Sequence, residues 1–252
     1  DQCPQAVRTV DGAPMETEFV LFDFDGVIAN TEESNAAYLE KALSAFGIQL
    51  TDDDRKALIG TNDKTRIESL LSRSLVKVTA EDLAGKRRQV GNTYENSCIR
   101  PMPGVVSLIQ EIRGRGIKTG LVTSTSTRLI MIALNRMRMT ALFDVVICGD
   151  MCANHKPDPE CYKKAMDYLG AEPCKCIVFE DSAVGIHAAR LAGARVAAYR
   201  GSGIQQDVSE ADLIVDSYDE CKDMLDDIMQ GRITQGRIMQ GRITQGGIMP
   251  CK

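Results

Sequence analysis

The sequence predicts an α/β fold: a doubly wound, Rossmann-like parallel sheet with an all-helical cap domain inserted after the first strand. Two observations predict this fold. An apolar run at residues 19–22, rich in Phe and Val, is typical of a strand buried on both faces. From Gly104 onward, apolar runs of strand length alternate with segments of helical period, which indicates βαβ units with right-handed crossovers. Residues 31–103, between these two parts, show helical patterns and no convincing strand.

The inserted segment begins with a helical pattern at 31–47, which Gly47 ends, and continues with helices expected at 52–59, 63–72 and 79–96. Proline and glycine at 101–104 close the insert. Beyond it we expect helices at 105–113, 127–138, 159–169 and 182–192, and strands at 117–123, 145–148, 176–179, 195–199 and 212–215. The expected domains are an α/β catalytic core (15–30 and 104–227), a cap (31–103) and a tail (228–252).

The tail differs in kind from the rest of the chain. Gln-Gly-Arg-Ile recurs there at five-residue spacing from Gln230, a period that fits neither a helix nor a strand. A glycine in each repeat would also weaken a helix by about 1 kcal/mol. We therefore expect a mobile, low-complexity appendage.

Composition excludes several classes of protein. A formal net charge of −5 over 252 residues argues against a nucleic-acid surface. No apolar run reaches the roughly 18–20 residues that span a bilayer, and residues 1–14 lack the apolar region of a secretory signal. The nine cysteines lack Cys-x-x-Cys spacing. We therefore expect reduced thiols and a cytoplasmic location.

The end of the first strand is chemically unusual. Asp23 and Asp25 follow the apolar run directly, and Gly26 follows them. Ionised carboxylates are costly to bury without a partner, and ligands of open α/β sheets bind at the carboxyl ends of the strands. A helix cap or an Asx turn explains Asp-x-Asp-Gly equally well in isolation.

Three other strand ends carry polar residues of the kinds that phosphoryl transfer uses. Residues 123–126 (Thr-Ser-Thr-Ser) offer hydroxyls and backbone N–H groups at a helix start, although simple capping by Ser126 is an alternative. Lys156 precedes another helix, where a solvated loop lysine is the alternative reading. Glu180 and Asp181 form a second acidic pair after an apolar strand.

These residues form a consistent set for one reaction. Two carboxylate clusters at neighbouring strand ends repel each other unless a divalent cation lies between them. A lysine and a hydroxyl can hold the remaining phosphoryl oxygens. An aspartate can attack phosphorus to give an aspartyl-phosphate, while a second carboxylate protonates the departing oxygen and later deprotonates water.

In this order and spacing, the four elements resemble the haloacid dehalogenase superfamily, and the position of the cap resembles its β-phosphoglucomutase-like branch. The resemblance covers residues 18–220. It implies that Asp23 is the nucleophile and Asp25 the general acid/base. It also implies that Thr123, with the backbone of Ser124, holds the transferring phosphoryl group and that Lys156 neutralises it.

The same resemblance implies Mg²⁺ as the cofactor. Its ligands would be Asp23, Asp181 and the carbonyl oxygen of Asp25, with Glu180 binding directly or through water. Members of the superfamily that break carbon–halogen or carbon–phosphorus bonds lack the second aspartate. The presence of Asp25 therefore favours phosphoester chemistry.

The cap departs from the mutase pattern. Thr31 fits the mutase hinge, but Asn35 stands where mutases carry a histidine. Around Gly60 the flanking cations of the mutases are missing, and only Lys64 is nearby. A mutase must hold a second phosphate while its intermediate turns over, which calls for fixed cations in the cap. Thr31, Asn35, Gly60 and Lys64 are thus the candidate substrate residues of the cap, and hydrolysis is favoured over transfer.

The sequence hypothesis is a phosphatase acting on a small phosphorylated metabolite of the sugar phosphate class, working as a monomer without nucleic-acid or membrane partners. A β-phosphoglucomutase-type mutase is the enzymatic alternative. A phosphate- or nucleotide-binding module without turnover is the non-enzyme alternative. Arg87 and Arg88 are interpreted as a solvated helix face rather than a phosphate site.

Overall fold

The computed structural model describes residues 16–58 and 64–230. Its core is a sheet of six parallel strands in the order β3-β2-β1-β4-β5-β6. The strands are β1 (Phe19–Phe22), β2 (Lys118–Val122), β3 (Val145–Ile147), β4 (Cys176–Glu180), β5 (Arg195–Tyr199) and β6 (Leu213–Val215). β1 lies in the middle of the sheet, between β2 and β4, which explains its apolar character on both faces.

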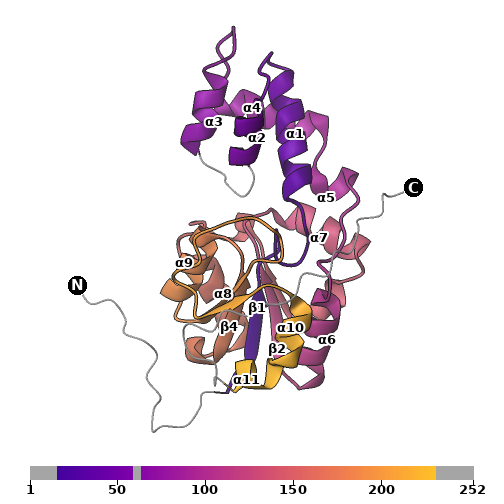
Figure 1. Cartoon of the computed structure of the whole chain (residues 1–252), viewed down its shortest axis with the longest axis vertical. Helices are drawn as coiled ribbons and strands as arrows, with labels where there is room; N and C mark the ends of the chain where they lie inside the picture. The colour runs from indigo at the N-terminus through magenta and orange to yellow at the C-terminus, as the bar shows by residue number, and fades with distance from the viewer. Residues whose placement is uncertain (1–15, 59–63, 231–252) are drawn as a thin grey trace, which may run out of the picture.

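Helices cover both faces of this sheet (Figure 1). They are α6 (Val105–Gly114), α7 (Thr127–Arg136), α8 (Glu160–Leu169), α9 (Ala183–Leu191), α10 (Tyr218–Asp223) and α11 (Leu225–Met229), with short 3₁₀ turns at Thr140–Leu142, Gly149–Met151 and Pro173–Lys175. Val20 and Phe22 pack with α6 and α10 in one apolar cluster, whereas Phe19 and Leu21 pack with α8 and α9 in another. This alternation confirms the predicted doubly wound architecture.

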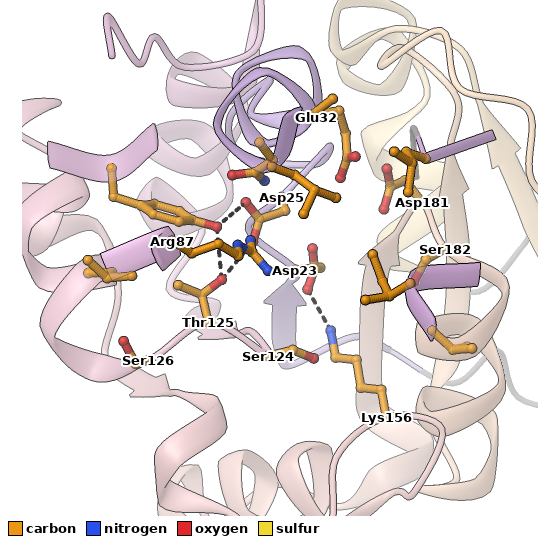
Figure 2. A pocket seen from close by; sticks show the side chains of 18 of the residues that line it. Asp23, Asp25, Glu32, Arg87, Ser124, Thr125, Ser126, Lys156, Asp181 and Ser182 are labelled. Atoms are coloured by element: carbon orange, nitrogen blue, oxygen red, sulfur yellow. Dashed lines mark hydrogen bonds and ion pairs between the residues drawn. The ribbon is translucent and has the colours of Figure 1, made fainter. Parts of the chain in front are cut away.

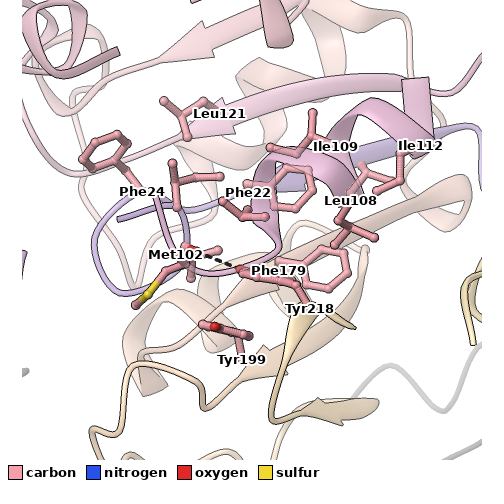
Figure 3. Close-up of a cluster of buried hydrophobic side chains, with 14 of the residues drawn as sticks. Phe22, Phe24, Met102, Leu108, Ile109, Ile112, Leu121, Phe179, Tyr199 and Tyr218 are labelled. Carbon is pink, nitrogen blue, oxygen red and sulfur yellow. Dashed lines mark hydrogen bonds between the residues drawn. The ribbon is translucent and has the colours of Figure 1, made fainter. Parts of the chain in front are cut away.

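Aromatic side chains pack around the carboxyl end of β1, which Asp23 and Asp25 follow (Figure 3). The rings of Phe22 and Phe179 stack with their centroids 5.1 Å apart. The buried hydroxyl of Tyr218 donates a hydrogen bond of 2.8 Å to the carbonyl of Val27 in the turn after β1. The buried core therefore holds the turn that carries the two aspartates in place through this hydrogen bond.

Residues 31–103 contain α1 (Glu32–Ser44), α2 (Asp52–Leu58), α3 (Lys64–Leu71), α4 (Ala80–Val90) and α5 (Thr93–Asn96). In Figure 1, α1 to α4 stand above the sheet. They bury an apolar cluster of their own, which includes Leu39, Leu43 and Leu83. Two linkers join this cap to the core, and they pair where Ala29 bridges Pro101 and the Met102 N–H donates to the Ile28 carbonyl at 2.8 Å.

Some predicted boundaries differ from the structure. The single helix expected at 79–96 is two helices, because Gly91 between them has a φ of 98°, in the region that favours glycine. The sequence analysis did not predict α10 and α11. Ile228 and Met229, expected at the start of the tail, are buried in α11. The repeats at 231–252 lie outside the described residues.

None of the helices in the described ranges has the length and apolar character needed to cross a bilayer.

Candidate active site

Asp23 and Asp25 lie at the carboxyl end of the central strand, as predicted. The Asp23 N–H continues the ladder by donating to the Phe179 carbonyl, and its side chain is buried. The chain then turns at Gly26, where φ is 81°. A Cβ atom at Gly26 would lie 1.9 Å from an Asp181 carboxylate oxygen, so the close approach of the two acidic strand ends requires glycine here.

Lys156 bridges the two acidic clusters, and Figure 2 shows its contact with Asp23. Its Nζ lies 2.5 Å from Asp23 Oδ1 and 2.6 Å from Glu180 Oε1, and it donates to the Val122 carbonyl at 3.2 Å. Burial opposes the charge of Lys156, but Asp23 and Glu180 raise its pKa well above the usual value. Burial also raises the pKa of Asp23 well above the ordinary range, and the attraction of Lys156 offsets this only in part.

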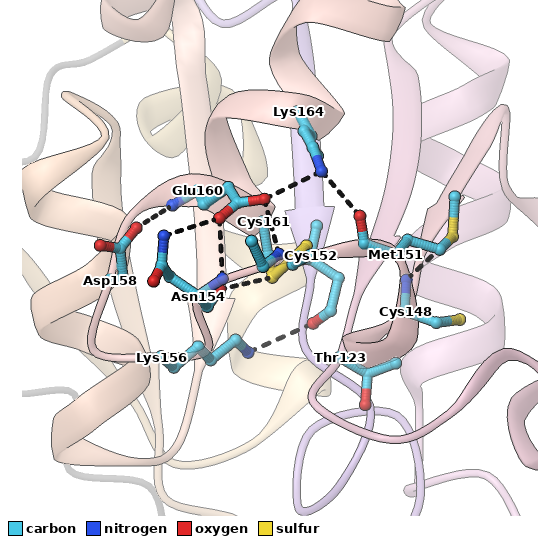
Figure 4. Close-up of a disulfide and its surroundings, with 12 residues drawn as sticks. Thr123, Cys148, Met151, Cys152, Asn154, Lys156, Asp158, Glu160, Cys161 and Lys164 are labelled. Atoms are coloured by element: carbon cyan, nitrogen blue, oxygen red, sulfur yellow. Dashed lines mark hydrogen bonds and ion pairs between the residues drawn. A yellow bond between two sulfur atoms is a disulfide. The ribbon is translucent and has the colours of Figure 1, made fainter.

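The loop before α8 positions Lys156 (Figure 4). The Glu160 carboxylate accepts hydrogen bonds from the backbone N–H groups of Ala153 at 2.9 Å and Asn154 at 2.8 Å, which closes the loop on itself. The sequence analysis placed this lysine in the site but did not predict the carboxylate that organises its loop.

A disulfide between Cys152 and Cys161 closes the same loop, with the two Cα atoms 5.9 Å apart. The expectation that the thiols are reduced is therefore wrong for this pair. The loop reverses direction and brings together two cysteines whose sequence separation of 9 carries no recognisable signature. Because persistent disulfides are rare in the cytosol, this pair does not support the expected cytoplasmic location.

Glu180 is fully buried, and both of its oxygens accept hydrogen bonds. Lys156 and the Tyr162 hydroxyl bind Oε1, the latter at 3.0 Å. The Asp181 N–H, the Ser182 N–H and the Ser182 hydroxyl bind Oε2. These donors account for a charged side chain at the buried end of β4.

Three carboxylates converge at this point. Oxygen atoms of Asp23, Glu180 and Asp181 lie within 4.8 Å of one another. Burial, followed by the charges of Glu180 and Asp23, raises the pKa of Asp181 well above the ordinary range. One ammonium group among three carboxylates, two of them buried and that of Asp181 half-buried, leaves an excess of negative charge on hard oxygen donors. This donor set fits Mg²⁺.

Three hydroxyl groups surround the Asp25 carboxylate. Thr31 and Tyr94 donate to Oδ1 at 2.5 and 2.7 Å, and Thr125 donates to Oδ2 at 3.1 Å. Thr31 is the predicted hinge residue. Thr125 belongs to the predicted segment 123–126, although its contact with Asp25 was not predicted, and the sequence analysis missed Tyr94. Tyr94 is 69 residues from Asp25 along the chain, so no local pattern could have indicated this contact.

The predicted phosphate-binding segment lies beside these groups. Ser124 lines the cavity next to Lys156. Thr123 is buried, and its hydroxyl accepts a hydrogen bond of 3.1 Å from the Thr125 N–H. The structure thus brings Thr123, Ser124 and Lys156 to one end of the sheet.

A cavity of about 570 Å³ extends from these groups to the cap. Asn35 lines it, and the Asn35 Oδ1 accepts a hydrogen bond of 2.7 Å from the Thr93 hydroxyl. Arg87, interpreted above as part of a solvated face, also lines the cavity. Gly60 lies outside the described residues, and so does the side chain of Lys64 at the start of α3.

A buried carboxylate paired with a lysine at the end of a central parallel strand, on the wall of a cavity, is an arrangement typical of enzyme active sites. The chain belongs to the haloacid dehalogenase-like hydrolase family, whose sequence profile matches residues 20–199. A phosphorylated carbohydrates phosphatase from Thermotoga maritima is 30% identical over 176 residues, which cover 70% of this chain and 82% of that protein.

Two solved structures support this membership at the level of the fold. The structure of CbbY from Rhodobacter sphaeroides in complex with phosphate has a TM-score of 0.68 and 27% identity, covering 81% of this chain and 96% of CbbY. The β-phosphoglucomutase from Clostridium difficile has a TM-score of 0.69 at 24% identity, with coverages of 86% and 98%. The latter likeness concerns the fold alone.

Proposed function

We propose that this chain is a magnesium-dependent phosphatase that hydrolyses a small phosphorylated metabolite of the sugar phosphate class through an aspartyl-phosphate intermediate. One observation carries the proposal. The buried Asp23 carboxylate lies 2.5 Å from the Lys156 ammonium, at the end of a cavity that Asp25, Ser124 and Asp181 also line. The cavity volume of about 570 Å³ is in the range of small-molecule sites.

Each residue has a defined task in this reaction. Asp23 attacks the phosphorus atom, and the bond to the leaving oxygen breaks while Asp25 donates a proton to that oxygen. Water then attacks the phosphorus, Asp25 accepts its proton, and inorganic phosphate leaves Asp23. Lys156 and Thr123, with the backbone of Ser124, hold the phosphoryl oxygens.

Asp23, Asp181 and the Asp25 carbonyl oxygen would hold Mg²⁺. Because donors of the protein already bind both oxygens of Glu180, we expect this residue to act through water. When bound, the ion supplies positive charge that offsets the charge of the phosphoryl group.

The sugar phosphate class is supported by the relatives, among them the phosphatase of phosphorylated carbohydrates from Thermotoga maritima. The test is phosphate release from a panel of phosphoesters with and without Mg²⁺, for the wild-type protein and for Asp23→Asn. We expect Mg²⁺-dependent release that the substitution abolishes. Release that persists in Asp23→Asn, or no release from any phosphoester, would overturn the proposal.

One observation favours the mutase as a second candidate. Arg87 places a cation of α4 on the cavity, where a second phosphate could bind. Conversion of β-glucose 1-phosphate to glucose 6-phosphate, primed by a bisphosphate, would establish this activity. Arg87→Ala should then lower it, while Arg88→Ala, at an exposed neighbour that does not line the cavity, should not. The cytoplasmic location and monomeric state stay predictions.

A further inference from the structure

Tyr94 is a buried titratable residue at the active site with no task in the mechanism above. Its hydroxyl donates to Asp25 Oδ1 at 2.7 Å and lies 2.9 Å from the Thr125 hydroxyl oxygen. The Thr125 hydroxyl in turn donates to Asp25 Oδ2 at 3.1 Å, and Figure 2 shows these two residues side by side. Tyr94 and Thr125 therefore bind opposite oxygens of one carboxyl group, and they fix its plane as well as its position.

Tyr94 is attached to the core although its sequence position lies in the cap. The Tyr94 carbonyl accepts a hydrogen bond of 2.6 Å from Arg136 on α7, and Glu95 pairs with Arg128 on the same helix at 2.5 Å. The Tyr94 ring packs into the apolar cluster of the core, with its centroid 6.1 Å from that of Phe24. Its hold on Asp25 is thus anchored to α7, and the same short helix also contacts α1 through the hydrogen bond between Thr93 and Asn35.

We propose that Tyr94 is a positioning residue, which aims the Asp25 carboxyl group at the leaving oxygen of the substrate from the core side of the site. The inference rests on the proposed phosphatase function. A general acid acts only when it lies within hydrogen-bond reach of the oxygen that it protonates. In Tyr94→Phe the Thr31 hydroxyl, from the segment that leads into the cap, still contacts Oδ1, but the hold on this oxygen from the core is lost and the carboxyl group can tilt toward Thr31.

The test compares two leaving groups in Mg²⁺-containing buffer. A sugar phosphate releases an alkoxide, which needs a proton from Asp25, whereas p-nitrophenyl phosphate releases a stable phenolate, which does not. The ratio kcat/KM reports only the steps through departure of the leaving group, so hydrolysis of the shared intermediate does not affect it. For Tyr94→Phe we expect kcat/KM to fall about tenfold or more for the sugar phosphate and less than about threefold for p-nitrophenyl phosphate.

Tyr38→Phe is the matched control, because Tyr38 lies on α1 and its hydroxyl has no hydrogen-bond partner among the described residues. Tyr38→Phe should leave kcat/KM unchanged for both substrates. Thr125→Val removes the other hydroxyl and provides a second test should Tyr94→Phe fold poorly. The same leaving-group dependence is expected, and the double variant should lose less than the product of the single losses because both residues hold one carboxyl group.

Equal losses of kcat/KM for both substrates in Tyr94→Phe and Thr125→Val, or no loss in either variant, would overturn the positioning role and leave the phosphatase function intact. A wild-type protein that releases no phosphate from either substrate would instead overturn the proposed function.

Discussion

Lys156 allows a quantitative test of the charge balance in the site. Its ammonium group lies between Asp23 and Glu180, and the three side chains are 4%, 10% and 0% exposed. Lys156→Met keeps the apolar stem and removes the charge. Two buried carboxylates would then face each other without a counter-charge.

The expected cost follows from this geometry. Removing one partner of a buried ion pair costs about 3–5 kcal/mol. Because the pKa of Asp23 is already raised, protonation of Asp23 can relieve part of the repulsion, and we take the lower end, about 3 kcal/mol. For a chain of this size, 1 kcal/mol shifts the midpoint by about 2–4 °C, so Lys156→Met should melt about 6–12 °C below the wild type.

The assay is thermal unfolding followed by circular dichroism at neutral pH without Mg²⁺. Lys164→Met is the matched control, since Lys164 pairs with Glu160 at the surface and is 40% exposed; it should melt with the wild type. The deficit of Lys156→Met should shrink as the pH falls, because the unpaired carboxylates become protonated. Equal midpoints for Lys156→Met and Lys164→Met at neutral pH would refute this reasoning.

Three further predictions concern the surroundings of Lys156. In Gly185→Ala, the new Cβ would lie 1.7 Å from Glu180 Oε1. We therefore expect the free energy of unfolding, measured in urea, to fall by about 1–3 kcal/mol and phosphate release to slow. Wild-type values of both quantities would contradict this reasoning. Lys164 and the backbone N–H groups of the loop lower the pKa of Glu160 to about 2. The Glu160 carboxylate therefore stabilises the fold above its unfolded pKa of about 4.3, and this contribution is lost as the pH falls through about 2. The difference in unfolding free energy between the wild type and Glu160→Gln should accordingly disappear in acid, and a difference that does not change with pH would contradict this prediction. Reduction of the Cys152–Cys161 bond should lower the free energy of unfolding by about 2–3 kcal/mol, measured with and without dithiothreitol, and an unchanged value would argue against a constraint on the loop.

The central sheet and the acidic strand ends were predictable because they depend on local patterns. A buried strand is a continuous apolar run, so the polar residues at its end stand out in the sequence. Asp23 directly follows such a run, whereas Lys156, 133 residues away along the chain, was assigned to the site from the family resemblance; in the structure the two side chains meet. The predicted doubly wound fold is confirmed for this reason.

The missed features depend on contacts that no local pattern encodes. Tyr94 reaches Asp25 because the chain breaks at Gly91 and α5 packs against α7 through Arg136. Arg87 has the sequence context of any exposed helical arginine, and only the orientation of α4 places it on the cavity. The helices after β6 are short, with little room for a periodic signal.

The two linkers between the core and the cap pair with each other. The chain leaves the core at Ala29 and returns at Pro101, and these residues meet across a single bridge. Because the two ends of the insert lie together, its length places little constraint on the fold of the core. The insert also buries an apolar cluster of its own. The helices between these linkers could therefore be exchanged for others of different length and lining, whereas Thr31 and the Tyr94 segment, which hold Asp25, would have to stay.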